Sequence, residues 1–195
     1  TMAVGSILND GVNGLNSGSV RVYYRTSTEE AWIQKGVDID GEAAQDYAGW
    51  SVSLSTDGDR LAIGAVFNDD GLNENTGHVR VFDWNNGTSQ WNQVGIDING
   101  GTSGDFFGYA VSMSADKTRI AIGAPHGLNM RGYVGVYYDN NGVWTKIADV
   151  EGAVEKGQFG KRIALKTDGS RLVVSAPKVG ILYYYSVDSS QVNLL

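Results

Sequence analysis

The amino-acid sequence predicts an all-β fold, a β-propeller built of four-stranded antiparallel blades. One segment that alternates large with very small residues recurs at positions 61–65, 120–124 and 172–176, and more loosely at 2–6. Short β-rich runs and turn residues accompany every copy. A four-stranded sheet cannot bury both faces alone, so neighbouring copies must pack around a common axis. An open β-solenoid or two sandwiches are the alternative architectures.

Composition agrees with a β-rich chain that has many turns. The 195 residues include 27 Gly, 2 Pro and no Cys, which excludes disulfides and cysteine-based metal sites. Of the 22 acidic residues 16 are Asp, a residue favoured in turns. The net charge of −7 disfavours nucleic acid as a partner, and no apolar run is long enough for a membrane span or a leader peptide.

Each repeat reads as four strands, named A to D here. Strand A alternates apolar and polar residues at 52–55, 111–114 and 163–166. A tight turn follows it, with Asp-Gly in two of the three copies, which is a strong hairpin signal. Strand B is the large-and-small segment. Its small residues predict that a neighbouring sheet approaches closely.

Strand C carries two apolar residues two positions apart, such as Val79 and Val81, followed by an aromatic residue. Strand D is marked by Trp32, Trp91 and Trp144, with Val192 at the matching place in the last copy. This gives strands B, C and D and then three complete sets, in repeat units 1–50, 51–109, 110–161 and 162–195. Because the first strand A is missing, the four blades either close a small ring with one gap or are consecutive members of a larger ring. We favour the larger ring, completed by the same chain or another subunit.

Two motifs bracket strands A and B and carry a family resemblance. Phe107-Gly108 precedes strand A and Gly123-Ala124-Pro125 ends strand B, and the next unit reads Phe159-Gly160 and Ser175-Ala176-Pro177. This pattern resembles the FG-GAP repeat of integrin-alpha-like β-propellers and covers essentially the full chain, with degenerate first copies. The resemblance implies an extracellular or cell-surface adhesion protein.

The calcium sites of that family are not carried over to this chain. Members that bind calcium use an Asp-x-Asp-x-Asp-Gly loop between strands A and B, whereas this joint is only four residues long here. Calcium needs six or more oxygen ligands, which such a turn cannot supply. No cofactor is therefore predicted, apart from weak cation binding as a hypothesis at Asp38, Asp40 and Glu42.

The connections from strand B to C and from strand D to the next A should emerge at one end of every blade. These segments hold thirteen acids and four bases, a net charge of −9, whereas the remainder of the chain carries +2. Such a one-signed rim attracts cations or basic partners. The alternative is that Asp and Asn merely form turns.

The main functional prediction is a non-enzymatic extracellular recognition or adhesion module that binds a protein partner through this acidic rim. Six residues of the two longest B-to-C loops are the predicted ligand contacts: Asn9, Asp10, Asn68, Asp69, Asp70 and Asn75. One alternative is a lectin-like carbohydrate binder that uses a rim aromatic such as Tyr47, Trp50 or Tyr109. Another is a purely structural spacer within a larger assembly.

Catalysis has little support in the sequence. His78 and His126 are the only histidines, and neither has a Ser or Asp partner in a local motif, so both are interpreted as polar rim residues. A glycosidase needs two carboxylates in one cleft, which the acidic rim permits without specifying. Asn86-Gly87-Thr88 is an N-glycosylation acceptor in a predicted C-to-D turn.

Overall fold

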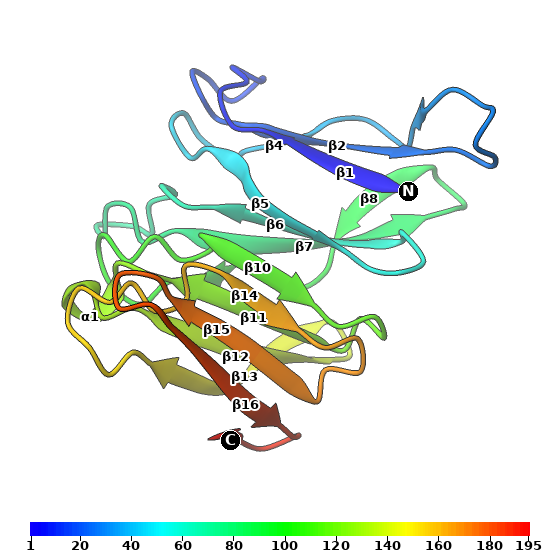
Figure 1. Ribbon diagram of the computed structural model, residues 1–195. Coiled ribbons are helices and arrows are strands. Elements are labelled where there is room, and N and C mark those ends of the chain that lie inside the picture. The colour runs from blue at the N-terminus through cyan, green and yellow to red at the C-terminus, as the bar shows by residue number, and fades with distance from the viewer.

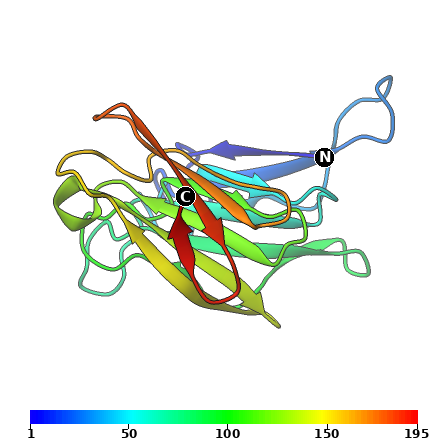
Figure 2. The same ribbon diagram turned by 60° about the horizontal axis from the view of Figure 1, so that its bottom comes forward.

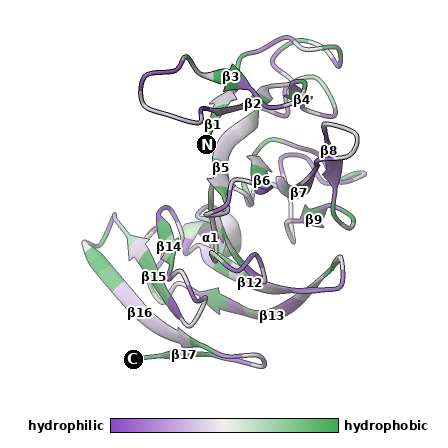
Figure 3. Cartoon of the chain, turned by 90° about the vertical axis from the view of Figure 1, so that its right-hand side faces the viewer, coloured by the Kyte–Doolittle hydropathy of each residue, from purple (hydrophilic) through white to green (hydrophobic).

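The computed structural model describes residues 1–195 and confirms the all-β prediction. Four antiparallel sheets follow one another along the chain, and we number them as blades 1 to 4. They lie side by side in an open arc, with blade 1 at one end and blade 4 at the other (Figures 1 and 3). The sheets are therefore arranged as the blades of a β-propeller are.

Blade 1 consists of β1 (Met2–Ser6), β2 (Ser19–Tyr24), β3 (Ile33–Gln34) and β4 (Ile39–Asp40). Blade 2 consists of β5 (Ala48–Leu54), β6 (Arg60–Ala65), β7 (His78–Asn85), β8 (Gln90–Gln93) and β9 (Ile98–Asn99). Blade 3 consists of β10 (Ala110–Met113), β11 (Arg119–Ala124), β12 (Tyr133–Asn140) and β13 (Val143–Glu151). Blade 4 consists of β14 (Ile163–Leu165), β15 (Arg171–Ala176), β16 (Ile181–Val187) and β17 (Val192–Leu194).

Strands A, B and C pair as the sequence predicts. In blade 2, β5 pairs with β6 and β6 with β7, with Leu54 opposite Leu61 and Leu61 opposite Phe82. The A-to-B hairpins need left-handed backbone, which Gly58 (φ +74°) and Gly169 (φ +69°) adopt without steric cost. In blade 3 a lysine takes this conformation instead, since Lys117 has φ +66°.

Strand D differs from the prediction in two blades. In blades 1 and 2 it is divided into two short strands that pair separately with strand C, β3 and β4 on β2, and β8 and β9 on β7. Trp32 lies just before β3 rather than inside it. In blade 3 strand D is continuous through β13. Asp149 and Glu151, which were counted among the thirteen acids of the connections, therefore belong to a strand.

The hydrophobic core lies between the blades rather than within one of them. Leu61, Ile63 and Phe82 of blade 2 pack on Val20 and Val22 of blade 1. Equivalent clusters join blades 2 and 3 and blades 3 and 4. Figure 3 shows the successive sheets between which these clusters lie.

The residues of the Phe-Gly and Gly-Ala-Pro motifs explain how closely successive blades approach. Phe107 and Phe159 are fully buried between blades, whereas Ala48 takes this place in blade 2. A Cβ atom added to Gly64 of β6 would lie 2.2 Å from the carbonyl oxygen of Gly108, the glycine that follows Phe107. The small residue of strand B is therefore required because the backbone of the next blade crosses directly over it.

One connection differs from the predicted plain loop. A single helical turn, α1 (Gly127–Met130), forms the link between β11 and β12. Leu128 and Asn129 inside it have left-handed backbone, with φ of 53° and 58°. The short sequence 126–131 must reverse direction within a few residues, and it does so by this compact turn.

The connections emerge on two opposite sides of the arc, at the two ends of the strands. The B-to-C loops, α1 and the D-to-A linkers gather at the left in Figure 1, and Figure 2 shows the same grouping from another side. We call this end the loop face. The A-to-B and C-to-D turns gather at the opposite end, the turn face. No helix of the chain has the length and apolar character that crossing a membrane requires.

Candidate functional site

An open groove of about 580 Å³ lies on the loop face at blade 2. Its walls come from the linker before β5, the start of β5 and the loop between β6 and β7. We call it the loop-face groove. It is lined by Ala44, Gln45, Tyr47, Trp50, Phe67, Asp69, Glu74 and Asn75.

Aromatic rings form a continuous row from this groove across to blade 3. The ring centroids of Tyr47 and Phe67 are 5.0 Å apart, and those of Trp50 and Phe67 are 6.0 Å apart. Trp50 is also 5.4 Å from Tyr109, which begins the blade 3 part of the row. All members are half-buried, so part of each ring faces solvent. The aromatic row consists of Tyr47, Trp50, Phe67, Phe106, Tyr109 and His126.

The row arises because every repeat places the same three positions on the loop face. These positions are the residue before the Phe-Gly motif, the residue after it and the residue after the Gly-Ala-Pro motif. They are Tyr47, Trp50 and Phe67 in blade 2, Phe106, Tyr109 and His126 in blade 3, and Gln158, Lys161 and Lys178 in blade 4. The loop face therefore changes from aromatic to basic along the arc.

The first of these positions has unusual backbone geometry. Tyr47 and Phe106 lie in the left-handed region, with φ of 56° and 55°, which costs a residue with a side chain about 1–2 kcal/mol. The amide of Tyr47 donates to the carbonyl of Asn16 (3.2 Å), and that of Phe106 donates to Asn75 (3.4 Å). The B-to-C loop of the preceding blade thus holds each aromatic residue in place, and such strain is often found at binding sites.

The linker behind the groove is fixed by a buried carboxylate. Asp46 is 4% exposed, and its Oδ2 accepts hydrogen bonds from the amide of Ala43 (2.9 Å) and from Nδ2 of Asn68 (3.3 Å). Burial raises the pKa of Asp46. Asp105 has the same role one repeat later, where it accepts hydrogen bonds from the Tyr133 hydroxyl and from Thr102. Asp46 and Asn68 are therefore occupied in building the linker.

The groove includes two of the six predicted ligand contacts, Asp69 and Asn75. Oδ1 of Asp69 accepts a hydrogen bond from the amide of Asn75 (2.7 Å), which closes the loop between them. Glu74, which the sequence analysis did not select, adds a second carboxylate whose side chain is exposed. The other predicted contacts lie outside the lining of this groove.

Those remaining residues contact their own loops. Oδ1 of Asn9 accepts a hydrogen bond from the amide of Gly11 (2.8 Å), and Oδ1 of Asp10 accepts one from the amide of Asn16 (3.1 Å). Asp70 forms an isolated β-bridge with Asn73. These contacts agree with the alternative interpretation that Asp and Asn residues in the loops merely form turns.

The three carboxylates considered for a weak cation site face different partners. Asp38 forms an ion pair with Arg21 (2.8 Å) and accepts a hydrogen bond from Gln34 (2.8 Å). Asp40 lies in β4, and its backbone carbonyl accepts a hydrogen bond from Arg80 (2.6 Å). Only Glu42 belongs to a group of side chains that converge closely enough to hold a cation.

That group is formed by Glu42, His78 and Asp97, whose ligand atoms lie within 4.8 Å of one another. His78 begins β7 and is 1% exposed. Its Nδ1 is 3.8 Å from Oε2 of Glu42 and 3.7 Å from Oδ2 of Asp97. Burial, with the charge of Arg80, lowers the pKa of His78 to about 4, so the imidazole is neutral at pH 7.

Sequence reasoning missed Phe67, Phe106, Glu74 and the pairing of His78 with Asp97. Aligning the repeats around their glycines would have found the two phenylalanines, because both occupy positions that are aromatic in the neighbouring blade. No local pattern predicts the pairing of His78 with Asp97, since β7 and the segment before β9 meet only through sheet pairing.

One segment of the chain is similar to a known repeat family. Residues 34–82 match the FG-GAP repeat. This matched segment includes β5, β6 and most of β7, with Tyr47, Trp50 and Phe67 of the aromatic row. No curated protein matches the chain.

Solved structures with the same arrangement support the propeller fold. A protein from Bacteroides uniformis, provisionally described as a 6-phosphogluconolactonase, aligns with a TM-score of 0.63 and 10% identity over 90% of this chain and 47% of its own. TolB from Acinetobacter baumannii aligns with a TM-score of 0.53 and 11% identity over 99% of this chain and 41% of its own. The chain thus spans about half the length of these structures. At such identities the likeness concerns the fold alone.

Proposed function

We propose that this chain is a non-enzymatic recognition module whose loop-face groove binds basic side chains of a protein partner. The observation that carries the proposal is the presence of aromatic rings and free carboxylate oxygens in one open groove. Tyr47, Trp50 and Phe67 line it with aromatic rings, and Asp69 and Glu74 line it with carboxylates.

An arginine or lysine side chain fits both parts of this groove. A cation over an aromatic ring gains about 0.5–2 kcal/mol, depending on its desolvation. A carboxylate within reach adds a charge-assisted hydrogen bond, and arginine can form two such bonds with one carboxylate. The excess of acids on the loop face would attract a basic partner over longer distances and make association depend on salt.

The groove lining favours binding over catalysis. It contains no serine, cysteine or histidine that could act as a nucleophile or a general base beside one. The residues that do have perturbed pKa values nearby, such as Asp46, are engaged in hydrogen bonds that shape the linker. We therefore expect no turnover of a substrate at this site.

Carbohydrate binding is the second candidate, because Trp50 and Tyr109, two of the aromatic residues considered for sugar binding, lie next to each other. Trp50 contacts both Phe67 and Tyr109, and Gln45 and Asn75 offer amide groups beside these rings. The ring planes of Trp50 and Phe67 are nearly perpendicular, at 81°, so they do not form one flat platform. This geometry suits a side chain inserted between rings better than an extended sugar stacked on them.

An extracellular location is part of the proposal. FG-GAP repeats are typical of extracellular proteins, and the match of residues 34–82 to this repeat supports such a location. Asn86, the glycosylation acceptor, lies exposed in the turn between β7 and β8 on the turn face, where a glycan would leave the loop face free. Expression in a eukaryotic secretory host, followed by mass analysis of the Asn86 peptide, would test whether Asn86 accepts a glycan.

The binding experiment uses a seven-residue arginine peptide as the probe, with tryptophan fluorescence as the readout. Glu74→Gln should weaken binding about twofold to fivefold, as expected for a solvent-exposed ion pair. Trp50→Ala should weaken it further, and raising the salt concentration should weaken it in the wild type. Glu29→Gln is the matched control, because Glu29 is an exposed acid in the β2–β3 connection on the turn face.

Two results would contradict the proposal. One is equal binding by the Glu74→Gln and Glu29→Gln variants. The other is salt-independent binding of an oligosaccharide from a glycan array that requires Trp50, which would establish the carbohydrate alternative instead.

A further inference from the structure

We infer that Glu42, His78 and Asp97 form a binding site for a divalent transition-metal ion, with Zn²⁺ as the best-matched candidate, at the junction of blades 1 and 2. The three side chains come from the linker before β5, the start of β7 and the segment between β8 and β9. One imidazole nitrogen and two carboxylate oxygens are ligands that Zn²⁺ accepts, whereas calcium takes oxygen ligands only.

Each carboxylate has one oxygen held by the protein and the other directed at the imidazole. Oδ1 of Asp97 accepts a hydrogen bond from Nε2 of Gln93 (2.7 Å), and its Oδ2 is 3.7 Å from Nδ1 of His78. Oε1 of Glu42 is 3.4 Å from Nη1 of Arg80, and its Oε2 is 3.8 Å from the same Nδ1. Outer partners of this kind orient metal ligands in known sites.

The separations are close to those of a metal centre. With bonds of 2.0–2.2 Å to nitrogen and oxygen, the ligand atoms of a tetrahedral Zn²⁺ lie about 3.4 Å apart. The Nδ1 distances here exceed this value by a few tenths of an ångström, and Glu42 is exposed enough to move inward. The fourth position would face solvent beside Glu42 and Asp97, and could hold water or an acidic group of a ligand.

His78 has no other interaction that would explain its burial. The side chain is fully enclosed, its Nε2 has no hydrogen-bond partner, and its Nδ1 is too far from either carboxylate for a direct hydrogen bond. A buried polar group in this condition normally costs stability. Coordination of a metal would give Nδ1 the polar partner that it lacks.

The other repeats show that this arrangement is special to blade 2. The position of His78 is occupied by Ser19 in blade 1 and by Tyr133 in blade 3. The aspartate at the position of Asp97 pairs with a basic side chain in both, Asp38 with Arg21 and Asp149 with Lys146. In blade 2, Arg80 instead donates a hydrogen bond to the Asp40 carbonyl, so Asp97 stays directed at the histidine.

The test is a calorimetric titration of the metal-stripped full chain with ZnCl₂ and, separately, with CaCl₂. We expect one Zn²⁺ per chain, a rise in melting temperature on binding and no comparable effect of Ca²⁺. His78→Ser introduces the blade 1 residue and should abolish Zn²⁺ binding. His126→Ser removes the only other histidine and should leave binding unchanged.

Two further variants keep the test decisive if His78→Ser fails to fold. Asp97→Asn removes a partly exposed ligand, and Gln93→Ala removes its positioning hydrogen bond. We expect Gln93→Ala to weaken Zn²⁺ binding about 10–100-fold. Loss of binding in the His126→Ser variant, retention in the Asp97→Asn variant, or no Zn²⁺ binding by the wild type would overturn the inference.

Discussion

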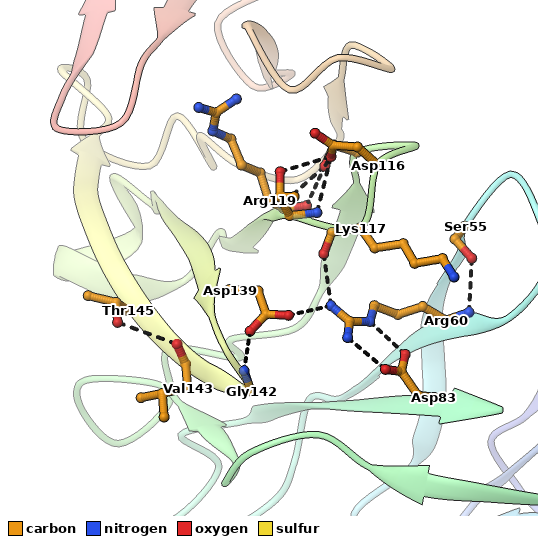
Figure 4. A network of polar contacts seen from close by, with 12 residues as sticks. Ser55, Arg60, Asp83, Asp116, Lys117, Arg119, Asp139, Gly142, Val143 and Thr145 are labelled. Atoms are coloured by element: carbon orange, nitrogen blue, oxygen red, sulfur yellow. Dashed lines mark hydrogen bonds and ion pairs between the residues drawn. The ribbon is translucent and has the colours of Figure 1, made fainter. Parts of the chain in front are cut away.

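Arg60→Ala is expected to destabilise the contact between blades 2 and 3 on the turn face. The guanidinium of Arg60 donates two hydrogen bonds to the Asp83 carboxylate, through Nε (2.6 Å) and Nη2 (2.7 Å) (Figure 4). Its Nη1 reaches across to blade 3, where Oδ2 of Asp139 (2.6 Å) and the carbonyl of Lys117 (2.9 Å) accept hydrogen bonds. The hydrogen bonds that Arg60 donates to Asp83 and Asp139 raise the pKa of Arg60.

The expected loss of unfolding free energy depends on how deeply Arg60 and its two aspartate partners are buried. The Arg60 side chain is 10% exposed and that of Asp139 is 15% exposed, whereas Asp83 is 42% exposed and partly screened by water. Removing one partner of a buried ion pair costs about 3–5 kcal/mol because the other charge is left without compensation. Since one of the two carboxylates can be hydrated, we expect a loss near the lower limit, about 3 kcal/mol. For a chain of this size that lowers the melting temperature by roughly 6–12 °C.

Urea unfolding and thermal melting of the variant measure this loss directly. Arg119→Ala is the matched control, because Arg119 occupies the same position one repeat later but makes only a 3.4 Å hydrogen bond to the Asp168 carbonyl. We expect that control to cost less than about 1 kcal/mol. The loss of stability in Asp139→Asn should lie between the losses in Arg60→Ala and Arg119→Ala. Equal losses for Arg60→Ala and Arg119→Ala would refute the assignment of Arg60 as the main polar link between these blades.

Two further predictions concern the blade contacts and the pH dependence. Gly64→Ala should cost at least 1–3 kcal/mol in urea unfolding, because its Cβ would lie 2.2 Å from the Gly108 carbonyl oxygen. The control Gly87→Ala, where the nearest atom is a side-chain oxygen at 3.2 Å, should be nearly neutral, and similar losses would contradict the close-approach argument. Burial raises the pKa of Tyr185 to about 12, so this phenol stays protonated in the folded chain at pH values where the unfolded chain ionises. The free energy of unfolding should therefore fall as the pH rises from about 10 towards 12, less steeply in Tyr185→Phe, and an identical pH profile for that variant would disprove the assignment.

Much of the architecture could be predicted because it is repeated in the sequence. The spacing of 59 residues between Gly5, Gly64 and Gly123 indicates one structural unit copied along the chain. Strand alternation and Asp-Gly turns then define each sheet and its direction. The division of strand D could not be predicted, because hydrogen bonding to strand C, rather than local residue preference, decides where it breaks.

The candidate site was predicted only in part. Loop composition predicted acids on the loop face, and two of the six selected residues, Asp69 and Asn75, line the groove. Asn9, Asp10 and Asn68 look equivalent to them in sequence, yet their side chains form hydrogen bonds that build the loops and the linker. Whether a loop carboxylate binds its own backbone or faces a ligand depends on loop conformation, which a residue count does not contain.

The sequence by itself determined the β-propeller class, the family resemblance and the end of the blades at which the longest connections lie. Only the tertiary structure decided which side chains meet. Glu42 and Asp97 are separated by 55 positions along the chain, yet both reach His78 because the linker of blade 1 passes over the start of β7. Side-chain chemistry is local in sequence, whereas convergence of ligands depends on how one sheet packs against the next.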